Sequence, residues 1–371
     1  MLAIHLAREG ADVDLFHTAH TPETREEAAS LVDFPPDVRG ALRSFVVGYP
    51  QPGKLPGHYV RDSRRYSERL LHRYRAEHIA ADFVYAQGLT GLAFTQARRQ
   101  QPQSLPPIGV NQHGYEMFQR AADWKTYLQH LLLRPSFAGL ARDADVVFAF
   151  PGRIDGIVRH QLGVPAERIA TAPNAVDESW IVDDKVPSPG IRRFVFVGRH
   201  ERRKGVPELL RAISSLGSHE FEFHFIGPIP EQLRLLRPHV VYHGSVVRPE
   251  TLQQLLDGCD VLVCPSFAEG MPTVVLEAMA RGLAIIATDV GATCEWVDST
   301  NGILLDSPDS EAIAQAIAKL LSISQAKLTG LQLASLAKAR ACTWPRVAAM
   351  TLQVIRDITC HPVGSQGREH D

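Results

Sequence analysis

Two glutamates could bind a polyhydroxylated ligand beside the start of a predicted helix. Glu269 and Glu277 are separated by seven residues in the segment EGMPTVVLEAMARG, which follows an apolar run predicted to be a strand at residues 261–264. The spacing puts Glu269 in the loop after that strand and Glu277 on the second turn of the helix. Carboxylates accept hydrogen bonds from hydroxyl groups, so Glu277 suits the vicinal hydroxyls of a ribose and Glu269 those of a sugar.

The start of the same helix is a predicted anion site. Pro272 is tolerated in the first helical turn, and Gly282 can adopt the left-handed conformation that ends a helix. The free N–H groups of a helix N-terminus and the helix dipole attract a negatively charged group such as a diphosphate. We expect the amides of Gly270, Met271 and Thr273 to supply these contacts. The alternative is a helix N-terminus that carries only solvated carboxylates.

A second group of charged residues follows the strand predicted at residues 194–197. The loop reads GRHERRKG, and a helix is predicted after it from about residue 207 to residue 216. Arg199 and Lys204 could neutralise a leaving diphosphate, whose negative charge grows as its bond to a sugar breaks. Taken alone, a basic surface loop is an equally good interpretation.

Two α/β halves would position these loops. Apolar β-branched runs alternate with amphipathic segments up to about residue 184, and the alternation restarts after residue 190, which predicts parallel strands joined by helical crossovers. The segment 183–190 holds charges, two prolines and a glycine, which favours a linker. The predicted strands lie at residues 12–16, 45–47, 83–85, 108–110 and 146–150 in the first half, and at residues 194–197, 221–226, 240–242, 261–264, 284–287 and 303–305 in the second.

The predicted architecture is therefore two Rossmann-like doubly wound domains that face a central cleft. Residues 1–186 would form the first domain and residues 187–344 the second. An amphipathic helix over residues 345–360, with Pro345 in its first turn, could cross back to the first domain, and residues 361–371 would form a disordered tail. Ligands bind open parallel sheets at the carboxyl ends of the strands, where the charged loops lie.

Composition excludes several other classes of protein. The chain has 371 residues, of which 39 are Lys or Arg and 41 are Asp or Glu. A net charge of −2 provides no bulk attraction to nucleic acid, so no nucleic-acid partner is expected. There is neither an apolar run of about 18 residues nor a signal peptide pattern, so we expect a cytoplasmic protein. The five cysteines lack zinc-ligand spacing, and no disulfide framework or metal site is expected.

Together the motifs resemble the retaining glycosyltransferases with two Rossmann-like domains, the GT-B fold, often called glycosyltransferase group 1 (family 4 type). Besides the two glutamates and the basic loop, four further motifs stand in the order expected of that family. They are Gln87-Gly88 and Asn111-Gln112-His113-Gly114, each after a predicted strand, Pro173-Asn174-Ala175-Val176-Asp177 before the linker, and Thr343-Trp344 before the last helix. The resemblance covers nearly the whole chain.

The resemblance implies transfer of a sugar from a nucleotide-sugar donor to an acceptor hydroxyl, with retention at the anomeric carbon and without a metal or other cofactor. By match to the family motifs, Arg199 and Lys204 would contact the diphosphate, Glu277 the ribose and Glu269 the donor sugar. His113 would face that sugar from the first domain. In the family's usual mechanism the leaving diphosphate deprotonates the incoming hydroxyl, which gives the two cations the largest share of transition-state stabilisation. Polysaccharide or glycoconjugate synthesis is an association at family level.

The chain departs from the family at its start. Family members open with a strand and a Gly-rich turn ahead of the first helix, whereas Met1 begins inside what is predicted to be that helix, residues 2–9, so the first strand and the Gly-rich loop are predicted to be missing. A truncated, non-catalytic protein that binds nucleotide-sugars is therefore one alternative. A phosphorylase and an epimerase of the same fold are two others.

A basic segment in the first half bears on the acceptor. Residues 61–75, RDSRRYSERLLHRYR, predict a basic helix that could rest weakly on anionic lipid at the inner face of the membrane. Enzymes of the family often use lipid-linked acceptors, so we expect a saccharide or lipid-linked acceptor. The interspersed Asp62 and Glu68 favour the alternative, a solvated helix face.

Overall fold

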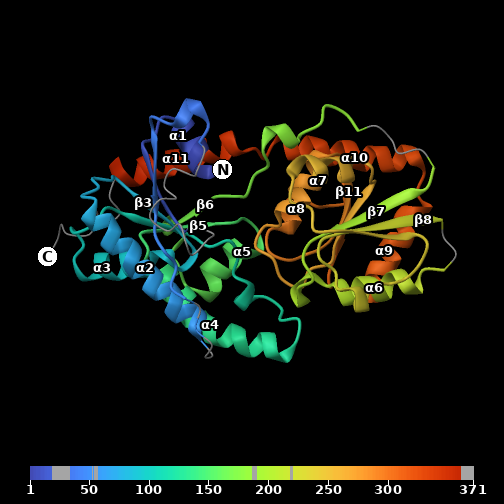
Figure 1. The fold of residues 1–371 in the computed structure, drawn as a ribbon, viewed down its shortest axis with the longest axis horizontal. Helices are drawn as coiled ribbons and strands as arrows, with labels where there is room; N and C mark the ends of the chain where they lie inside the picture. The colour runs from blue at the N-terminus through green and yellow to red at the C-terminus, as the bar shows by residue number, and fades with distance from the viewer. Residues whose placement is uncertain (19–33, 52, 54–56, 186–189, 218–219, 361–371) are drawn as a thin grey trace.

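The computed structural model describes residues 1–18, 34–51, 53, 57–185, 190–217 and 220–360. Its helices and strands form two α/β halves that lie side by side (Figure 1). The predicted tail, residues 361–371, and residues 186–189 of the predicted linker lie outside the described residues.

The strands of the N-terminal half form two separate parallel sheets. One pairs β1 with β2, and the other has the order β3-β4-β5-β6. All five predicted strands are confirmed, whereas the three-residue β6 was not predicted. Within the described residues no strand joins the two sheets, and the chain begins with the predicted helix, α1 (Leu2–Arg8). The strands are β1 (Val13–His17), β2 (Leu42–Val46), β3 (Val84–Gln87), β4 (Ile108–Asn111), β5 (Val146–Ala149) and β6 (Ile169–Thr171).

Three long helices pack against the four-stranded sheet. They are α2 (His58–Ala76), α3 (Leu92–Gln100) and α4 (Trp124–Asp143), and a short α5 (Arg153–Gly156) follows β5. The basic segment noted in the sequence is confirmed as α2, and it is amphipathic. Tyr66, Leu70 and Leu71 are buried against the core, while Arg64 and Arg65 are exposed.

The C-terminal half is one six-stranded parallel sheet with the order β12-β11-β10-β7-β8-β9, and all six predicted strands are confirmed. Successive residues of β10 face opposite sides of the sheet, so Val261 and Leu262 belong to different apolar clusters, and helices cover both faces. The strands are β7 (Arg192–Val197), β8 (Phe221–Ile226), β9 (Val240–Gly244), β10 (Val261–Cys264), β11 (Ala284–Thr288) and β12 (Gly302–Leu305); the helices are α6 (Val206–Ser215), α7 (Pro249–Asp257), α8 (Thr273–Ala280), α9 (Ser310–Ser322) and α10 (Gln325–Arg340).

The last helix, α11 (Trp344–Cys360), returns to the N-terminal half, as predicted (Figure 1). Its Ala348 and Leu352 pack against Leu6 of α1. The chain thus passes between the halves twice, and the two passing segments touch. Val176, ahead of the linker, donates its backbone N–H to the Cys342 carbonyl at 3.0 Å, and Val176 and Thr343 form a parallel bridge.

Candidate active site

The charged loops lie where the strand order of the C-terminal sheet reverses. From the middle of the sheet, β7, β8 and β9 succeed one another toward one edge, and β10, β11 and β12 succeed one another toward the other edge. Strands β7 and β10 are therefore neighbours at the point where the order reverses. This is the position at which open α/β sheets bind ligands. The loops after β7 and β10 are closely packed. Gly205 has φ +70°, and a Cβ at this position would collide with the Pro265 carbonyl oxygen.

Glu269 is the centre of a buried charged cluster. Its side chain is only 7% exposed, and its Oε1 lies 2.6 Å from Lys204 Nζ. Its Oε2 lies 3.0 Å from Arg203 Nη1, and the Ser266 hydroxyl donates to Oε1 at 2.7 Å. Burial lowers the pKa of Arg203, but the carboxylates of Glu269 and Glu201 outweigh this and raise it above its ordinary value. Two cations therefore neutralise one buried carboxylate.

The predicted cations of the β7 loop differ in their surroundings. Lys204 points to Glu269 and is mostly buried, whereas the Arg199 side chain is 76% exposed and pairs with Glu201 at 2.9 Å. Arg203 and Ser266 complete the cluster, and neither was singled out from the sequence. Three consecutive basic residues at positions 202–204 give no periodicity that would indicate which side chains face the cleft.

The start of α8 leaves hydrogen-bond donors free. The helix begins at Thr273, with Pro272 as its N-cap, and Gly282 after it has φ +68°, as predicted. Within the described residues, the backbone N–H groups of Gly270, Met271 and Thr273 donate to no protein acceptor. The sequence had predicted these three amides as an anion site, and the structure places them together at the helix N-terminus.

Glu277 lies on the second turn of α8 with no side-chain hydrogen bond to any described residue. Burial raises the pKa of its carboxyl to about 6. An unpaired, desolvated carboxylate beside free amides has unused capacity to accept hydrogen bonds. This suits contact with ligand hydroxyls.

The N-terminal half contributes the loop after β4. His113 and Gly114 lie directly against Gly270, and a Cβ at Gly270 would collide with the His113 carbonyl oxygen. Packing of protein around the His113 imidazole lowers its pKa, and the nearby Glu116 only partly offsets this. The ring retains exposed surface and is neutral at pH 7. The resemblance implies that His113 faces the donor sugar from the first domain, and the structure brings its loop into contact with the loop that holds Glu269.

Two amide side chains join the halves. Gln119 Nε2 donates to the Glu269 carbonyl oxygen at 2.6 Å, and its Oε1 accepts from Gly291 N at 3.2 Å. Asn174 Nδ2 donates to the Met271 carbonyl at 2.8 Å. Asn174 belonged to a recognised motif, whereas nothing in the sequence identified Gln119.

A cavity of about 410 Å³ opens beside the loop that follows β10, on the side of β11 and β12. Phe267, in the loop after β10, lines the cavity, and the guanidinium of Arg202 from the β7 loop lies 4.6 Å from its ring centroid. Within the described residues, the buried hydroxyl of Thr288 has no hydrogen-bond partner, and Arg153 is paired with Asp289. The cavity is lined by Gln119, Arg120, Arg153, Phe267, Thr288 and Asp289, among others.

Among the residues that the structure describes, no group of three or more His, Cys, Asp or Glu side chains is arranged to hold a metal ion. No helix among the same residues is both long enough and apolar enough to span a bilayer.

The sequence matches two family patterns. Residues 1–180 match "Glycosyltransferase Family 4" and residues 191–322 match "Glycosyl transferases group 1". The chain therefore belongs to the group 1, family 4 glycosyltransferases. This confirms the resemblance drawn from the sequence motifs.

Individual relatives agree with the family assignment. A D-inositol 3-phosphate glycosyltransferase of Paenarthrobacter aurescens is 29% identical over 243 residues, covering 58% of this chain and 57% of the relative. A putative teichuronic acid biosynthesis glycosyltransferase, TuaC of Bacillus subtilis, is 36% identical over 128 residues, covering 34% of this chain and 32% of the relative. The matches thus span less than two thirds of either relative.

Solved structures establish the fold. Sucrose-phosphate synthase from Thermosynechococcus elongatus superposes with a TM-score of 0.79 at 20% identity, covering 97% of this chain and 92% of the other. An E. coli trehalose-6-phosphate structure bound with UDP-2-fluoro glucose gives a TM-score of 0.70 at 12% identity, covering 96% and 95%. The predicted GT-B fold is confirmed.

Proposed function

We propose that this chain transfers a sugar from a nucleotide-sugar donor to an acceptor hydroxyl, with retention at the anomeric carbon and without a metal, in polysaccharide or glycoconjugate synthesis. One observation carries the proposal. Lys204 and Arg203 converge on Glu269 at the reversal of the sheet, beside an unpaired Glu277 and free helix amides. These groups match the charges and hydroxyls of a nucleotide diphosphate sugar.

The cluster suggests how a donor would bind. Lys204 is held by Glu269 in the absence of a ligand, and a diphosphate would compete for this ammonium group. Arg199, exposed at the rim, could then turn onto the same phosphates. Release of Lys204 gives Glu269 Oε1 capacity to accept a hydrogen bond from the donor sugar. Arg203 and the Ser266 hydroxyl stay on the carboxylate. Glu277 would accept from the ribose.

The chemistry requires no nucleophile from the protein. The bond between the anomeric carbon and the diphosphate oxygen breaks, and the acceptor oxygen bonds to the same face of that carbon. The proton of the acceptor hydroxyl passes to the departing diphosphate oxygen. Lys204 and Arg199 stabilise the charge that develops on the diphosphate, and the His113 loop closes the other side of the sugar site.

The cavity on the β11 side is the proposed acceptor site. Gln119 lines the cavity and donates to the Glu269 carbonyl oxygen, so an acceptor held there would lie beside the proposed donor-sugar site. The cavity's mixture of amide, hydroxyl, guanidinium and carboxylate groups matches the hydroxyls of a saccharide, either free or linked to a lipid.

The proposal can be tested with donors alone and then with acceptors. Calorimetric titration with UDP-, GDP- and ADP-sugars is expected to give saturable binding for one nucleotide class, with and without a chelator. Transfer to a panel of saccharide acceptors, followed by NMR of the anomeric proton, then reports the configuration of the product. Product of inverted configuration, or a strict need for a divalent metal, would contradict the mechanism.

A binding-only protein is the second candidate. The observation that favours it is the division of the N-terminal strands into two sheets, which leaves this half less cross-linked than the C-terminal half. Such a protein would bind the donor through the C-terminal half and release no nucleotide from it. A coupled assay for nucleotide release separates the two candidates.

A further inference from the structure

The first half of α4 carries an apolar stripe that faces away from the protein. Its five members are spaced i, i+3, i+4, i+7 and i+8, so they share one side of the helix. Their exposed fractions run from 40% to 68%, and they are Trp124, Tyr127, Leu128, Leu131 and Leu132. We call these five residues the outer stripe of α4. In Figure 1 this end of α4 projects from the body of the N-terminal half.

The outer stripe is distinct from the face that packs into the core. His130, Phe137, Leu140 and Ala141 are the buried residues of the same helix. A helix that is apolar on its core face and again on its outer face is unusual for a surface helix, which normally presents polar side chains to water. Clustered exposed aromatic and aliphatic side chains of this kind mark a surface that binds something.

Charge indicates the kind of partner. Asp123 caps the start of α4, and no other Asp or Glu follows before Asp143. Lys125 and the half-buried Arg134, which also donates to the Met117 carbonyl, flank the stripe. Lys125 Nζ lies 5.9 Å from the ring centroid of Trp124, and the Arg134 guanidinium lies 6.0 Å from the ring centroid of Tyr127. Aromatic and leucine side chains bordered by cations are typical of helices that lie in the interface of an anionic bilayer.

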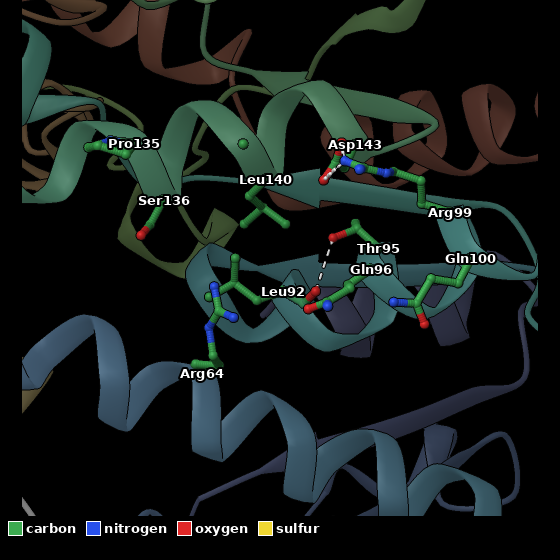
Figure 2. Close-up of a pocket in the computed structure, with 11 residues that line it drawn as sticks. Arg64, Leu92, Thr95, Gln96, Arg99, Gln100, Pro135, Ser136, Leu140 and Asp143 are labelled. Carbon is green, nitrogen blue, oxygen red and sulfur yellow. Dashed lines mark hydrogen bonds and ion pairs between the residues drawn. The ribbon is translucent and has the colours of Figure 1, made fainter.

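A groove lined by Arg64, Arg99 and Asp143 continues from the outer stripe, and Arg99 is paired with Asp143 at 3.2 Å. The groove has a volume of about 400 Å³ and lies between α2, α3 and α4. Figure 2 shows Arg64 of α2 on one side of it and Ser136 of α4 on the other, with Arg99 of α3 at the far end. Ser136 is one turn beyond Leu132 on the same face of α4, so the stripe leads directly into the groove.

We propose that the outer stripe of α4 inserts into the interface of an anionic lipid bilayer, with the exposed arginines of α2 and the groove binding lipid phosphates. Arg64 and Arg65 provide exposed guanidinium groups on the neighbouring helix. A second copy of the chain fits less well, because two such stripes packed together would bring their flanking cations close to each other. The sequence had placed weak lipid contact on α2 alone; the structure adds the apolar part.

The docking surface also lies close to the proposed acceptor cavity. Arg120 lines that cavity and stands four residues before Trp124. A bilayer against α4 would therefore lie near the cavity proposed to hold the acceptor, within reach of a saccharide linked to a lipid in that bilayer. Lipid binding does not itself depend on the proposed transfer reaction, so vesicle experiments test it separately.

Vesicle flotation of the full chain is the test. The protein is expected to float with vesicles of phosphatidylcholine and phosphatidylglycerol, to float poorly with phosphatidylcholine alone, and to dissociate as salt is raised. Replacing Leu128→Asp and Leu132→Asp together is expected to lower partitioning by about 10²-fold or more. Leu333→Asp is the matched control, because Leu333 is a comparably exposed leucine, 46%, on α10 of the other half.

Two further measurements keep the result interpretable. Circular dichroism and donor binding should be unchanged in the double variant, since both leucines are exposed. Quenching by brominated lipid should reach Trp124 in the wild type and be lost in Trp124→Phe. Failure of the wild type to bind anionic vesicles would overturn the proposal, as would equal binding of the double variant. A dimer at rising concentration that the double variant abolishes would assign the stripe to a second copy instead.

Discussion

At the scale of single residues, the proposed transfer depends on an exchange of partners by Lys204. In the structure its ammonium group lies 2.6 Å from Glu269, so it is already oriented by a buried carboxylate before any donor arrives. Orientation before binding reduces the reorganisation needed when charge develops on a leaving group. Through the same contact Lys204 also neutralises Glu269. Removing the lysine would therefore take away the cation for the diphosphate and also leave the buried Glu269 carboxylate with less compensating charge.

Lys204→Ala is therefore expected to lower turnover by about 10²-fold or more, with a smaller effect on donor KM. Lys204→Arg should recover part of this loss because it restores the charge. Steady-state kinetics with the donor identified by calorimetry is the measurement. The control is Arg211→Ala, an exposed cation on α6. Near-normal turnover in Lys204→Ala would remove this residue from the mechanism.

Burial of Glu277 is expected to make both the free energy of unfolding and the affinity for the donor depend on pH. The Glu277 pKa of about 6 is above the ordinary glutamate value, so the folded protein holds this proton more tightly than the unfolded chain does. The free energy of unfolding therefore falls as pH rises through the interval from about 4.5 to 6. Ligand hydroxyls require the ionised form, so donor affinity is expected to rise as pH passes upward through about 6.

Glu277→Gln separates these two effects. Above pH 6 the variant should be more stable than the wild type by about 1–2 kcal/mol, with no difference near pH 4. Donor affinity should fall and lose its pH dependence. Thermal denaturation and calorimetry at matched pH values measure the two quantities. A variant that lost stability at neutral pH would show that Glu277 is paired rather than unsatisfied.

At the scale of elements, the return of α11 to α1 determines how firmly the start of the chain is held. Leu352 is 8% exposed and packs on Leu6, whereas Met350 on the same helix is 51% exposed. Leu352→Ala should weaken this contact by about 2 kcal/mol and speed hydrogen exchange of α1 amides by about 30-fold. Met350→Ala should leave exchange unchanged. Unaltered exchange in α1 after Leu352→Ala would mean that other contacts hold this helix.

Most strands of both halves could be predicted from the sequence because they are apolar runs bounded by turn residues. Strands of the C-terminal sheet, such as Val261–Cys264, are apolar on both faces and flanked by turn residues, so their pattern is strong. The strand Ile169–Thr171 is only three residues long and half-exposed, and it carried no comparable signal. The division of the N-terminal strands into two sheets depends on pairing between distant residues, which periodicity does not report.

At the scale of the whole molecule, the candidate site is assembled from both halves. Buried side chains of both halves form one continuous apolar cluster, and Gln119 connects the Glu269 loop with Gly291. The sequence predicted which loops would carry chemistry. It could not predict Gln119, whose partner Glu269 is 150 residues away. A single glutamine in a loop carries no sequence pattern that would indicate a hydrogen bond between the two halves.

Gln119→Ala removes two hydrogen bonds across the closed interface. It is expected to increase the radius of gyration measured by small-angle X-ray scattering and to weaken donor binding by about 10-fold. Gln129→Ala, an exposed glutamine on α4, is the control. Unchanged scattering together with unchanged donor affinity would show that closure does not depend on this side chain.

The bridge between Val176 and Thr343 has a mechanical consequence. Because both passages of the chain between the halves are hydrogen-bonded to each other, they act as a single hinge rather than as two independent tethers. Such a paired ribbon bends easily across its width but resists torsion about its length. A rotation of one half against the other would therefore turn about this paired segment rather than about two separate connections.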